Sequence, residues 1–98
     1  MMRAIELSIK SVNSGTGPFG AVIVKNNKII SEGFNTVTLV NDPTSHAEIL
    51  TITKSCYKRK KKLLLDTTLF VTLEPCIMCA AAISEAHISR VYFGAYDE

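Results

Sequence analysis

Two short segments of the sequence carry residue types that could hold a metal ion. His46 and Glu48 lie in His-Ala-Glu, and Cys76 and Cys79 lie in Pro-Cys-Ile-Met-Cys. Two thiolates and one imidazole are three ligands that Zn²⁺ accepts, which leaves its fourth tetrahedral position open for water. That pattern is typical of a catalytic zinc site rather than a structural one. The helix-like spacing of the two cysteines would let both sulfurs reach the same ion.

A zinc-activated water also needs a residue that carries its proton. Zinc lowers the pKa of a bound water towards about 7, so hydroxide can form at neutral pH. Glu48 follows His46 by two residues. We therefore predict that Glu48 takes the proton of the water and returns it to a ring nitrogen and to a departing amine.

Each motif also has a plainer explanation when it is taken alone. Ser45 and Glu48 fit the capping-box pattern Ser-x-x-Glu, in which the glutamate only secures a helix start. His46 could be an ordinary surface or core histidine, and the Cys-x-x-Cys pair could be a redox pair or half of a structural zinc site. Cys56 and His87 are the only other thiol and imidazole in the chain, so a four-cysteine site lacks ligands. The two motifs together favour catalytic zinc.

The N-terminal half of the chain predicts a helix followed by a hairpin. Apolar residues recur at steps of three and four, which predicts an amphipathic helix over residues 2–13; they are Met2, Ile5, Ile9 and Val12. Residues 19–25 predict a buried strand and residues 28–35 its antiparallel partner. Asn26-Asn27 between them can adopt the positive φ values of a tight turn.

The C-terminal half predicts a helix, a strand, a helix and a strand. A second helix begins near Ser45 and ends near the basic run 58–62, and residues 69–73 form a third strand. Pro75 is placed at the first position of a third helix, which extends to about Glu85. Residues 91–95 form a fourth strand, which we expect to lie parallel to the third because a helix joins the two. Both chemical motifs therefore begin helices at one edge of a sheet, where substrates usually bind.

Composition narrows the class of protein. The chain has 98 residues, 47% of them apolar, which fits one compact domain. Its net charge of +2 does not by itself argue for nucleic acid. The basic run 58–62 could contact phosphates, although a solvated loop is the commoner explanation.

The sequence shows no apolar stretch long enough for a membrane span and no signal peptide, so we predict a cytoplasmic location and no membrane partner. Cys56, outside the motif, is expected to be a small buried hydrophobic residue.

The sequence resembles the cytidine deaminase-like superfamily, in particular its tRNA-specific adenosine deaminases and bacterial guanine deaminases. His-x-Glu followed by Pro-Cys-x-x-Cys is the signature of zinc-dependent deaminases. The resemblance runs from the first helix to Asp97 and includes residues 17–24, 41–48 and 72–79. It implies an α/β fold of three layers, with helices on both faces of a mixed central sheet, and one zinc-dependent deaminase domain over residues 1–98. It also implies that the chain is truncated at its C-terminus, because family members usually continue past the fourth strand with another strand and one or two helices.

The resemblance further implies a substrate site and a partner. Asn35 would hydrogen-bond the base, and Phe19 would line the pocket, although core packing is an equal explanation for a phenylalanine. Ala47 and Glu74 complete the expected substrate-binding residues. The family's tRNA enzymes act as homodimers, which we expect here as well.

Three functions follow from the resemblance. We predict conversion of adenosine to inosine in a tRNA anticodon loop, since residues 88–97 are closer to the tRNA enzymes and the basic run could meet phosphates. Deamination of free guanine, or of cytosine or a nucleoside, is the alternative, because residues 17–20 and 37–44 are closer to guanine deaminases. A catalytically silent, zinc-containing subunit is the third; the retained Glu48 speaks against it.

Overall fold

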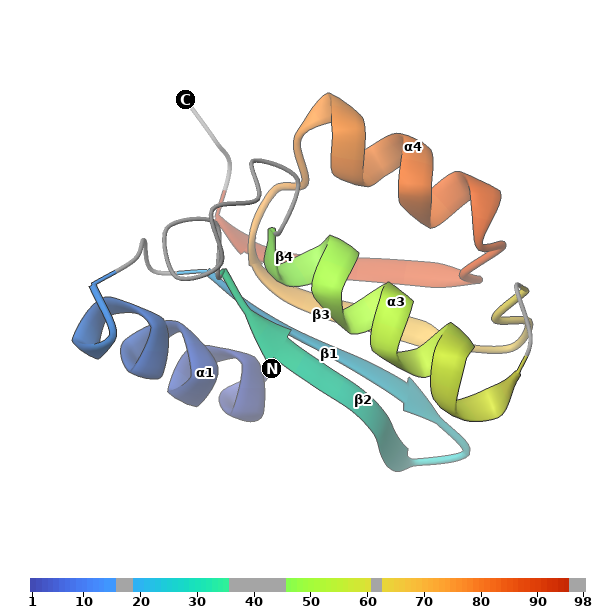
Figure 1. The fold of residues 1–98 in the computed structure, drawn as a ribbon, viewed down its shortest axis with the longest axis horizontal. Coiled ribbons are helices and arrows are strands. Elements are labelled where there is room, and N and C mark those ends of the chain that lie inside the picture. The colour runs from blue at the N-terminus through green and yellow to red at the C-terminus, as the bar shows by residue number, and fades with distance from the viewer. Residues whose placement is uncertain (16–18, 36–45, 61–62, 96–98) are drawn as a thin grey trace.

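The computed structural model describes residues 1–15, 19–35, 46–60 and 63–95. Within these ranges three helices alternate with four strands (Figure 1). In chain order they are α1 (Met2–Asn13), β1 (Gly20–Lys25), β2 (Lys28–Phe34), α3 (Ala47–Arg59), β3 (Thr68–Leu73), α4 (Ile77–Glu85) and β4 (Arg90–Ala95). The predicted elements are confirmed, with boundaries that differ by a residue or two. Residues 15–18 are predicted to form a turn, and residues 36–45 are predicted to contain a loop. All of them except Gly15 lie outside the described ranges.

The four strands form one mixed sheet in the order β2-β1-β3-β4. β1 pairs antiparallel with both β2 and β3, whereas β3 and β4 are parallel. The hairpin turn between β1 and β2 is built from Asn26 and Asn27, with φ values of 53° and 62°. Asparagine tolerates this left-handed region better than most residues, and two such residues in succession match the twist of a hairpin. The predicted mixed α/β fold is confirmed.

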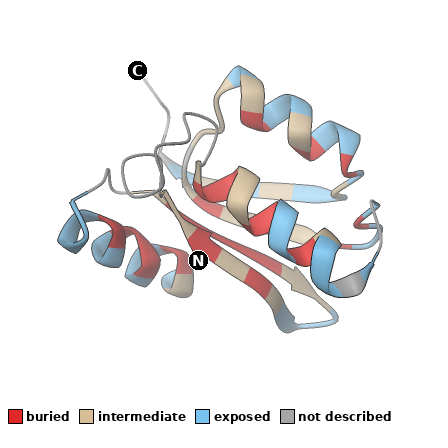
Figure 2. Cartoon of the chain, in the orientation of Figure 1, coloured by how far each residue is buried: buried red, intermediate tan, exposed pale blue. Residues whose placement is uncertain are grey.

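The sheet separates two helical layers because its side chains alternate between faces. Ala21 and Ile23 of β1 join the larger core cluster, beneath α3 and α4, with Leu69 and Val71 of β3. Val22 between them points the other way and packs against α1. The first four residues of β1 are accordingly all buried, and Figure 2 marks buried residues on the strands and on the helices that cover them. This arrangement leaves α3 and α4 together on one face and α1 on the opposite face (Figure 1).

The apolar residues that predict α1 do not form its buried side. Met2, Ile5, Ile9 and Val12 are exposed, Met2 by 80% of its surface, and we call these four the exposed apolar flank. The residues turned to the sheet are instead mostly small: Ala4, Leu7, Ser8 and Ser11. The cause is the close approach of the helix to β1. A Cβ atom on Gly20 would lie only 2.7 Å from the backbone nitrogen of Ser8, so large side chains have no room there.

A two-pronged ion pair holds α1 against β2. The Nε and Nη2 atoms of Arg3 each donate a hydrogen bond of 2.7 Å to a carboxylate oxygen of Glu32. These hydrogen bonds hold the pKa of Glu32 below its usual range, and partial burial of the carboxylate opposes them. The pair therefore stabilises the fold where Glu32 is ionised in the native protein.

No helix in the described ranges combines the length and the apolar character that crossing a membrane would require.

Replacing Glu32 by Gln is expected to lower the urea midpoint of unfolding slightly at pH 7. A carboxylate whose pKa is lowered by folding contributes stability above its usual pKa of 4.5 and loses it as the pH falls through the native value. The difference between Glu32→Gln and wild type should therefore shrink on acidification below pH 4.5. Glu6→Gln is the control, since Glu6 meets Arg3 only in an exposed contact of 3.3 Å. Equal midpoints for wild type and Glu32→Gln at pH 7 would contradict the assignment.

Candidate metal centre

The sheet topology brings two helix starts together. β2 and β3 are both antiparallel to β1, so their C-terminal ends lie at the same edge of the sheet. α3 follows β2 in the chain and α4 follows β3, and both helices cover the same face (Figure 1). Their N-termini therefore lie close to each other at that edge. His46 comes immediately before α3, and Cys76 comes immediately before α4.

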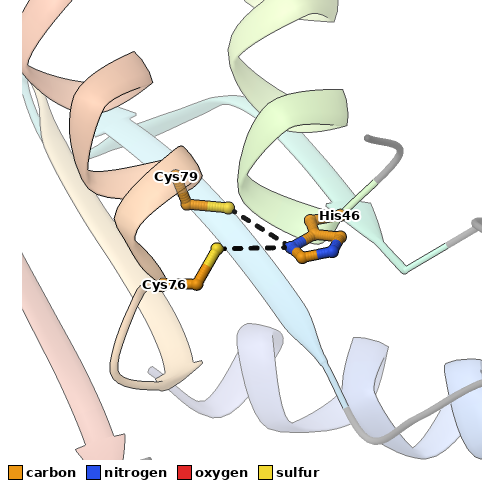
Figure 3. A group of neighbouring side chains, drawn as sticks. All are labelled: His46, Cys76 and Cys79. Atoms are coloured by element: carbon orange, nitrogen blue, oxygen red, sulfur yellow. Dashed lines mark hydrogen bonds between the residues drawn. The ribbon is translucent and has the colours of Figure 1, made fainter. Parts of the chain in front are cut away.

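Both helix starts use an unusual residue as N-cap. N-caps are normally Ser, Thr, Asp or Asn, whose side chain accepts a hydrogen bond from the first turn. His46 and Cys76 occupy this position with extended backbones, and in the described structure neither side chain caps its helix. The two side chains are turned towards each other instead (Figure 3). The helix starts thus lack a local hydrogen bond that would fix them, and the side chains are available for another partner.

The predicted place of Pro75 is wrong. α4 begins at Ile77, so Pro75 precedes the N-cap instead of occupying the first helical position. The backbone of Cys76 is still extended, with φ −71° and ψ 175°. A residue before the N-cap continues the extended segment from β3, which proline also favours through its fixed φ. Cys76 is therefore presented from the end of an extended segment, and Cys79 from the first turn of the helix.

Three ligand atoms converge at this edge. The Nδ1 atom of His46 lies 3.6 Å from the sulfur of Cys76 and 3.5 Å from the sulfur of Cys79. All three atoms lie within 4.8 Å of one another. Figure 3 shows both sulfurs directed at the same ring nitrogen. A neutral imidazole nitrogen has one lone pair, so two thiols cannot both donate a good hydrogen bond to it. The arrangement suits ligands that share one ion.

The distances fit zinc. Zn–N bonds of about 2.05 Å and Zn–S bonds of about 2.3 Å at a tetrahedral angle place the nitrogen and each sulfur about 3.6 Å apart. The separations of 3.6 and 3.5 Å match this value. Imidazole and thiolate are also the ligand types that zinc selects over magnesium and calcium, which prefer oxygen. His46, Cys76 and Cys79 are thus placed to hold one zinc ion through three protein ligands.

Burial makes the site depend on a cation. Cys79 is fully buried, while His46 and Cys76 are half-buried. Burial raises the pKa of the Cys79 thiol far above its usual range, and the nearby Glu48 carboxylate and Cys76 thiol raise it further. Without a cation the Cys79 sulfur therefore keeps its proton. Zinc binding requires the thiolate and releases this proton, which couples metal affinity to pH.

Glu48 lies beside the three ligands. Its side chain is 6% exposed, and its carboxylate is close enough to Cys79 to raise the pKa of that thiol. The N-cap of α3 is His46, and its side chain makes no capping hydrogen bond. Ser45, the other half of the proposed capping box, lies outside the described residues. A buried carboxylate next to a cation site is placed to accept and return protons.

The remaining predicted site residues are Phe19, Asn35, Ala47 and Glu74. Asn35 and Phe19 are neighbours, since the backbone N–H of Asn35 donates to the carbonyl of Phe19 at 3.2 Å. Phe19 is half-buried and packs against the larger core cluster, and the side chain of Ala47 is fully buried in that cluster. Glu74 is half-buried between β3 and Cys76. The substrate-binding roles of these four residues remain predictions.

Sequence reasoning missed one residue that supports the site. Thr51 is fully buried on α3, and its hydroxyl donates a hydrogen bond of 2.6 Å to the carbonyl of Ala47. Its position, four residues after Ala47, is the spacing at which a helical threonine bonds back to the preceding turn. This spacing was the available signal, but the burial of Thr51 depends on the sheet beneath it.

Comparison with known proteins identifies the family. A family model described as the cytidine and deoxycytidylate deaminase zinc-binding region matches residues 1–95. The chain belongs to this family. Within the deaminase family, it is 47% identical over 96 residues to the guanine deaminase of Bacillus subtilis. It is 50% identical over 95 residues to the tRNA-specific adenosine deaminase of Buchnera aphidicola. Each alignment covers 97% of this chain.

Solved structures of deaminases have the same fold. A structure from studies of A-to-I editing by tRNA:A34 deaminases matches with a TM-score of 0.96 and 41% identity, covering 99% of this chain and 75% of that one. The Bacillus subtilis guanine deaminase structure matches with a TM-score of 0.94, covering 97% of this chain and 61% of that one. The chain spans about three fifths of the length of the curated relatives it matches, 62% and 59% for the two named above.

Cys79→Ala is expected to abolish stoichiometric zinc binding. The variant leaves two ligands, too few for a stable site in this geometry, and removes the cation that the buried site requires. Zinc per chain, measured by elemental analysis after gel filtration, should fall from about one to a small fraction. Cys56→Ala is the matched control, because Cys56 is the free cysteine outside the cluster and should leave the zinc content unchanged. Equal zinc in Cys79→Ala and wild type would contradict the ligand set.

Proposed function

We propose that residues 1–98 act as one zinc-dependent deaminase domain that hydrolyses the exocyclic amine of adenosine in a tRNA anticodon loop. The observation that carries the proposal is the buried carboxylate of Glu48 beside the cluster of His46, Cys76 and Cys79. A purely structural zinc site has no use for such a carboxylate, whose burial costs free energy unless it is compensated.

The reaction replaces an amine by an oxygen. A new C–O bond forms from water at the ring carbon that carries the exocyclic amine, the C–N bond breaks, and ammonia leaves. Zinc, when bound, polarises a water molecule and lowers its pKa. Glu48 accepts the proton of that water, delivers it to the adjacent ring nitrogen, and then transfers a second proton to the departing amine. Its position on the first turn of α3 keeps the carboxylate in place through each transfer.

Two features support RNA over a free base as substrate. Several relatives of the chain are tRNA-specific adenosine deaminases. Those from Buchnera, Aquifex and Haemophilus are 41–50% identical to it. In addition, exposed Lys58 and Lys60 follow the strongly exposed Tyr57 at the far end of α3, which is 13 residues long. A helix of this length spans about 20 Å, so these side chains could meet phosphates of an RNA stem whose loop reaches the zinc site.

Guanine is the second candidate substrate. The Bacillus subtilis guanine deaminase is 47% identical, as close as the tRNA enzymes. The zinc cluster and Glu48 would serve either base, because both reactions hydrolyse an exocyclic amine on a purine ring.

We further propose that the chain functions as a homodimer paired through α4. This helix is apolar around most of its circumference, yet of its residues only Cys79 and Ile83 are buried. Ile77 is 90% exposed, and Ala80, Ala81 and Ser84 lie on the same exposed side at helical spacing. A helix that is apolar all round is normally covered on every side. Since Ile77 adjoins Cys76, a partner on this surface would lie next to the zinc site.

A cytoplasmic location fits the tRNA substrate and the three free cysteines.

Glu48→Gln is expected to lower inosine formation by about 10²- to 10⁴-fold while zinc content stays at the wild-type level, since the amide cannot accept the proton of water. The assay mixes the protein with tRNA bearing adenosine at the first anticodon position and measures inosine by nuclease digestion and chromatography. Free guanine and free adenosine are tested in parallel by ammonia release.

The variant also controls for contamination, because any turnover that survives it comes from another enzyme. Ammonia from free guanine without inosine in tRNA would replace the tRNA proposal by guanine deamination. Undiminished turnover by Glu48→Gln on either substrate would remove Glu48 from the mechanism.

Ile77→Glu is expected to convert the protein from dimer to monomer, because it puts a charge in place of the largest exposed apolar side chain of the proposed α4 interface. Sedimentation velocity should give the mass of two chains for wild type and of one chain for the variant. Ile29→Glu is the control, because Ile29 is an isoleucine that is 52% exposed on β2, away from α4. A monomeric wild type, or a dimeric Ile77→Glu, would contradict the proposed interface.

A further inference from the structure

The start of α3 is attached to β2 by contacts beneath the zinc site. Thr51 of α3 is fully buried, and Ser31 of β2 is nearly so. The hydroxyl of Ser31 donates a hydrogen bond of 2.8 Å to the carbonyl of Thr51. The hydroxyl of Thr51 in turn donates to the carbonyl of Ala47, the residue between His46 and Glu48. Two buried hydrogen bonds therefore link β2 to the segment that carries a zinc ligand and the proposed proton carrier.

A glycine sets how closely the helix approaches the strand. A Cβ atom on Gly33 of β2 would lie 2.9 Å from Oγ1 of Thr51 and 3.3 Å from Cδ2 of Leu50. The first of these is closer than carbon and oxygen normally approach, so any side chain at this position would push α3 outward or force Thr51 to move. The hydroxyl of Thr51 cannot turn away without losing its hydrogen bond to the carbonyl of Ala47, and both residues are fully buried from solvent.

The zinc site tolerates little displacement of α3. His46 is the N-cap of α3, whereas Cys76 is the N-cap of α4 and Cys79 lies in its first turn. The nitrogen–sulfur separations already match those that zinc requires, and metal sites accept deviations of only about 0.2 Å in bond length. A shift of α3 that the cysteines do not follow would therefore change the site directly.

We propose that Gly33 and Thr51 are positioning residues for the zinc site: they set the depth of α3 on β2, and thereby the place of His46 and Glu48 relative to the cysteine pair. The inference rests on the same cluster as the proposed function. It concerns how the cluster is held, so it is tested through metal binding, and it stands or falls independently of which base is deaminated.

Gly33→Ala is expected to weaken zinc binding by about 10- to 100-fold, the range found when groups supporting metal ligands are altered. Zinc affinity is measured by competition with a chromophoric chelator. The cobalt-substituted protein gives a second readout, because its visible bands report tetrahedral geometry and thiolate ligation. Gly33→Ala/Thr51→Ala should bind zinc more tightly than Gly33→Ala, since removing Oγ1 removes the closest contact of the new methyl group, but several-fold less tightly than wild type, since the hydrogen bond to Ala47 is also lost.

Leu7→Ala is the control for a general loss of stability. Leu7 is buried under α1 on the opposite face of the sheet, so its truncation should lower the unfolding midpoint while leaving zinc affinity and the cobalt spectrum unchanged. Wild-type zinc affinity and cobalt spectrum in Gly33→Ala would overturn the proposal. A double variant that binds zinc no more tightly than Gly33→Ala would overturn the steric contact assigned to Gly33 and Thr51.

Thr51→Val and Thr51→Ser test the hydrogen bond without adding volume at Gly33, and remain available if Gly33→Ala does not fold. Valine keeps the shape of threonine but cannot donate to Ala47, so zinc affinity should fall several-fold. Serine keeps the donor and should restore it. Equal zinc affinity in the two variants would show that the hydroxyl does not position the site. If wild type binds zinc as expected but deaminates neither tRNA nor guanine, the proposed function fails and this inference is unaffected.

Discussion

The structure depends on the convergence of one imidazole nitrogen and two sulfurs from separate helix starts. Among the described residues no side chain caps the start of either helix, and the Cys79 sulfur is fully buried, which raises the pKa of its thiol. A cation resolves both conditions, because it holds the two starts together and stabilises the thiolate that burial disfavours. The positive ends of the two helices, directed towards the same place, add to the stabilisation of thiolate. Folding and metal binding are therefore coupled at this edge of the sheet.

The sheet makes that convergence possible through the direction of its strands. Because β1 runs against both of its neighbours, the chain leaves β2 and β3 at the same edge and enters a helix each time on the same face. β4, parallel to β3, returns the chain after α4. The β1–β2 hairpin is antiparallel and the β3–β4 unit is parallel. The helices that follow β2 and β3 nevertheless begin close to each other. Reversing β2 or β3 alone would place the histidine and the cysteines at opposite ends of the strands.

Much of this organisation could be predicted from the sequence, and the exceptions have physical causes. The strands, the Asn26-Asn27 turn and the residues of the metal cluster follow from local patterns that act over a few residues. The location of Pro75 was wrong because proline is compatible with both a first helical turn and the extended segment before it, and only the backbone of Cys76 distinguishes the two. The depth of α3, set by Gly33 and Thr51, depends on an approach between elements that no local pattern encodes.

Helix α1 is a second case in which the sequence pattern predicts the element but not how it packs, and its packing leaves apolar side chains exposed. Its apolar spacing indicated a helix correctly, but the exposed apolar flank is turned away from β2, whose side is marked by the contacts of Arg3 and Lys10. Next to it on the same face of the sheet, the ring of Tyr92 stacks on Phe70 and is 52% exposed. A sheet of four strands spaced by about 4.8 Å is about as wide as two packed helices. α1 alone therefore covers about half of this face of the sheet. Aliphatic and aromatic side chains are therefore exposed to solvent on this face. In dilute buffer we expect the chain to bind detergents, hydrophobic dyes and column matrices more readily than a domain of its size whose apolar side chains are all covered.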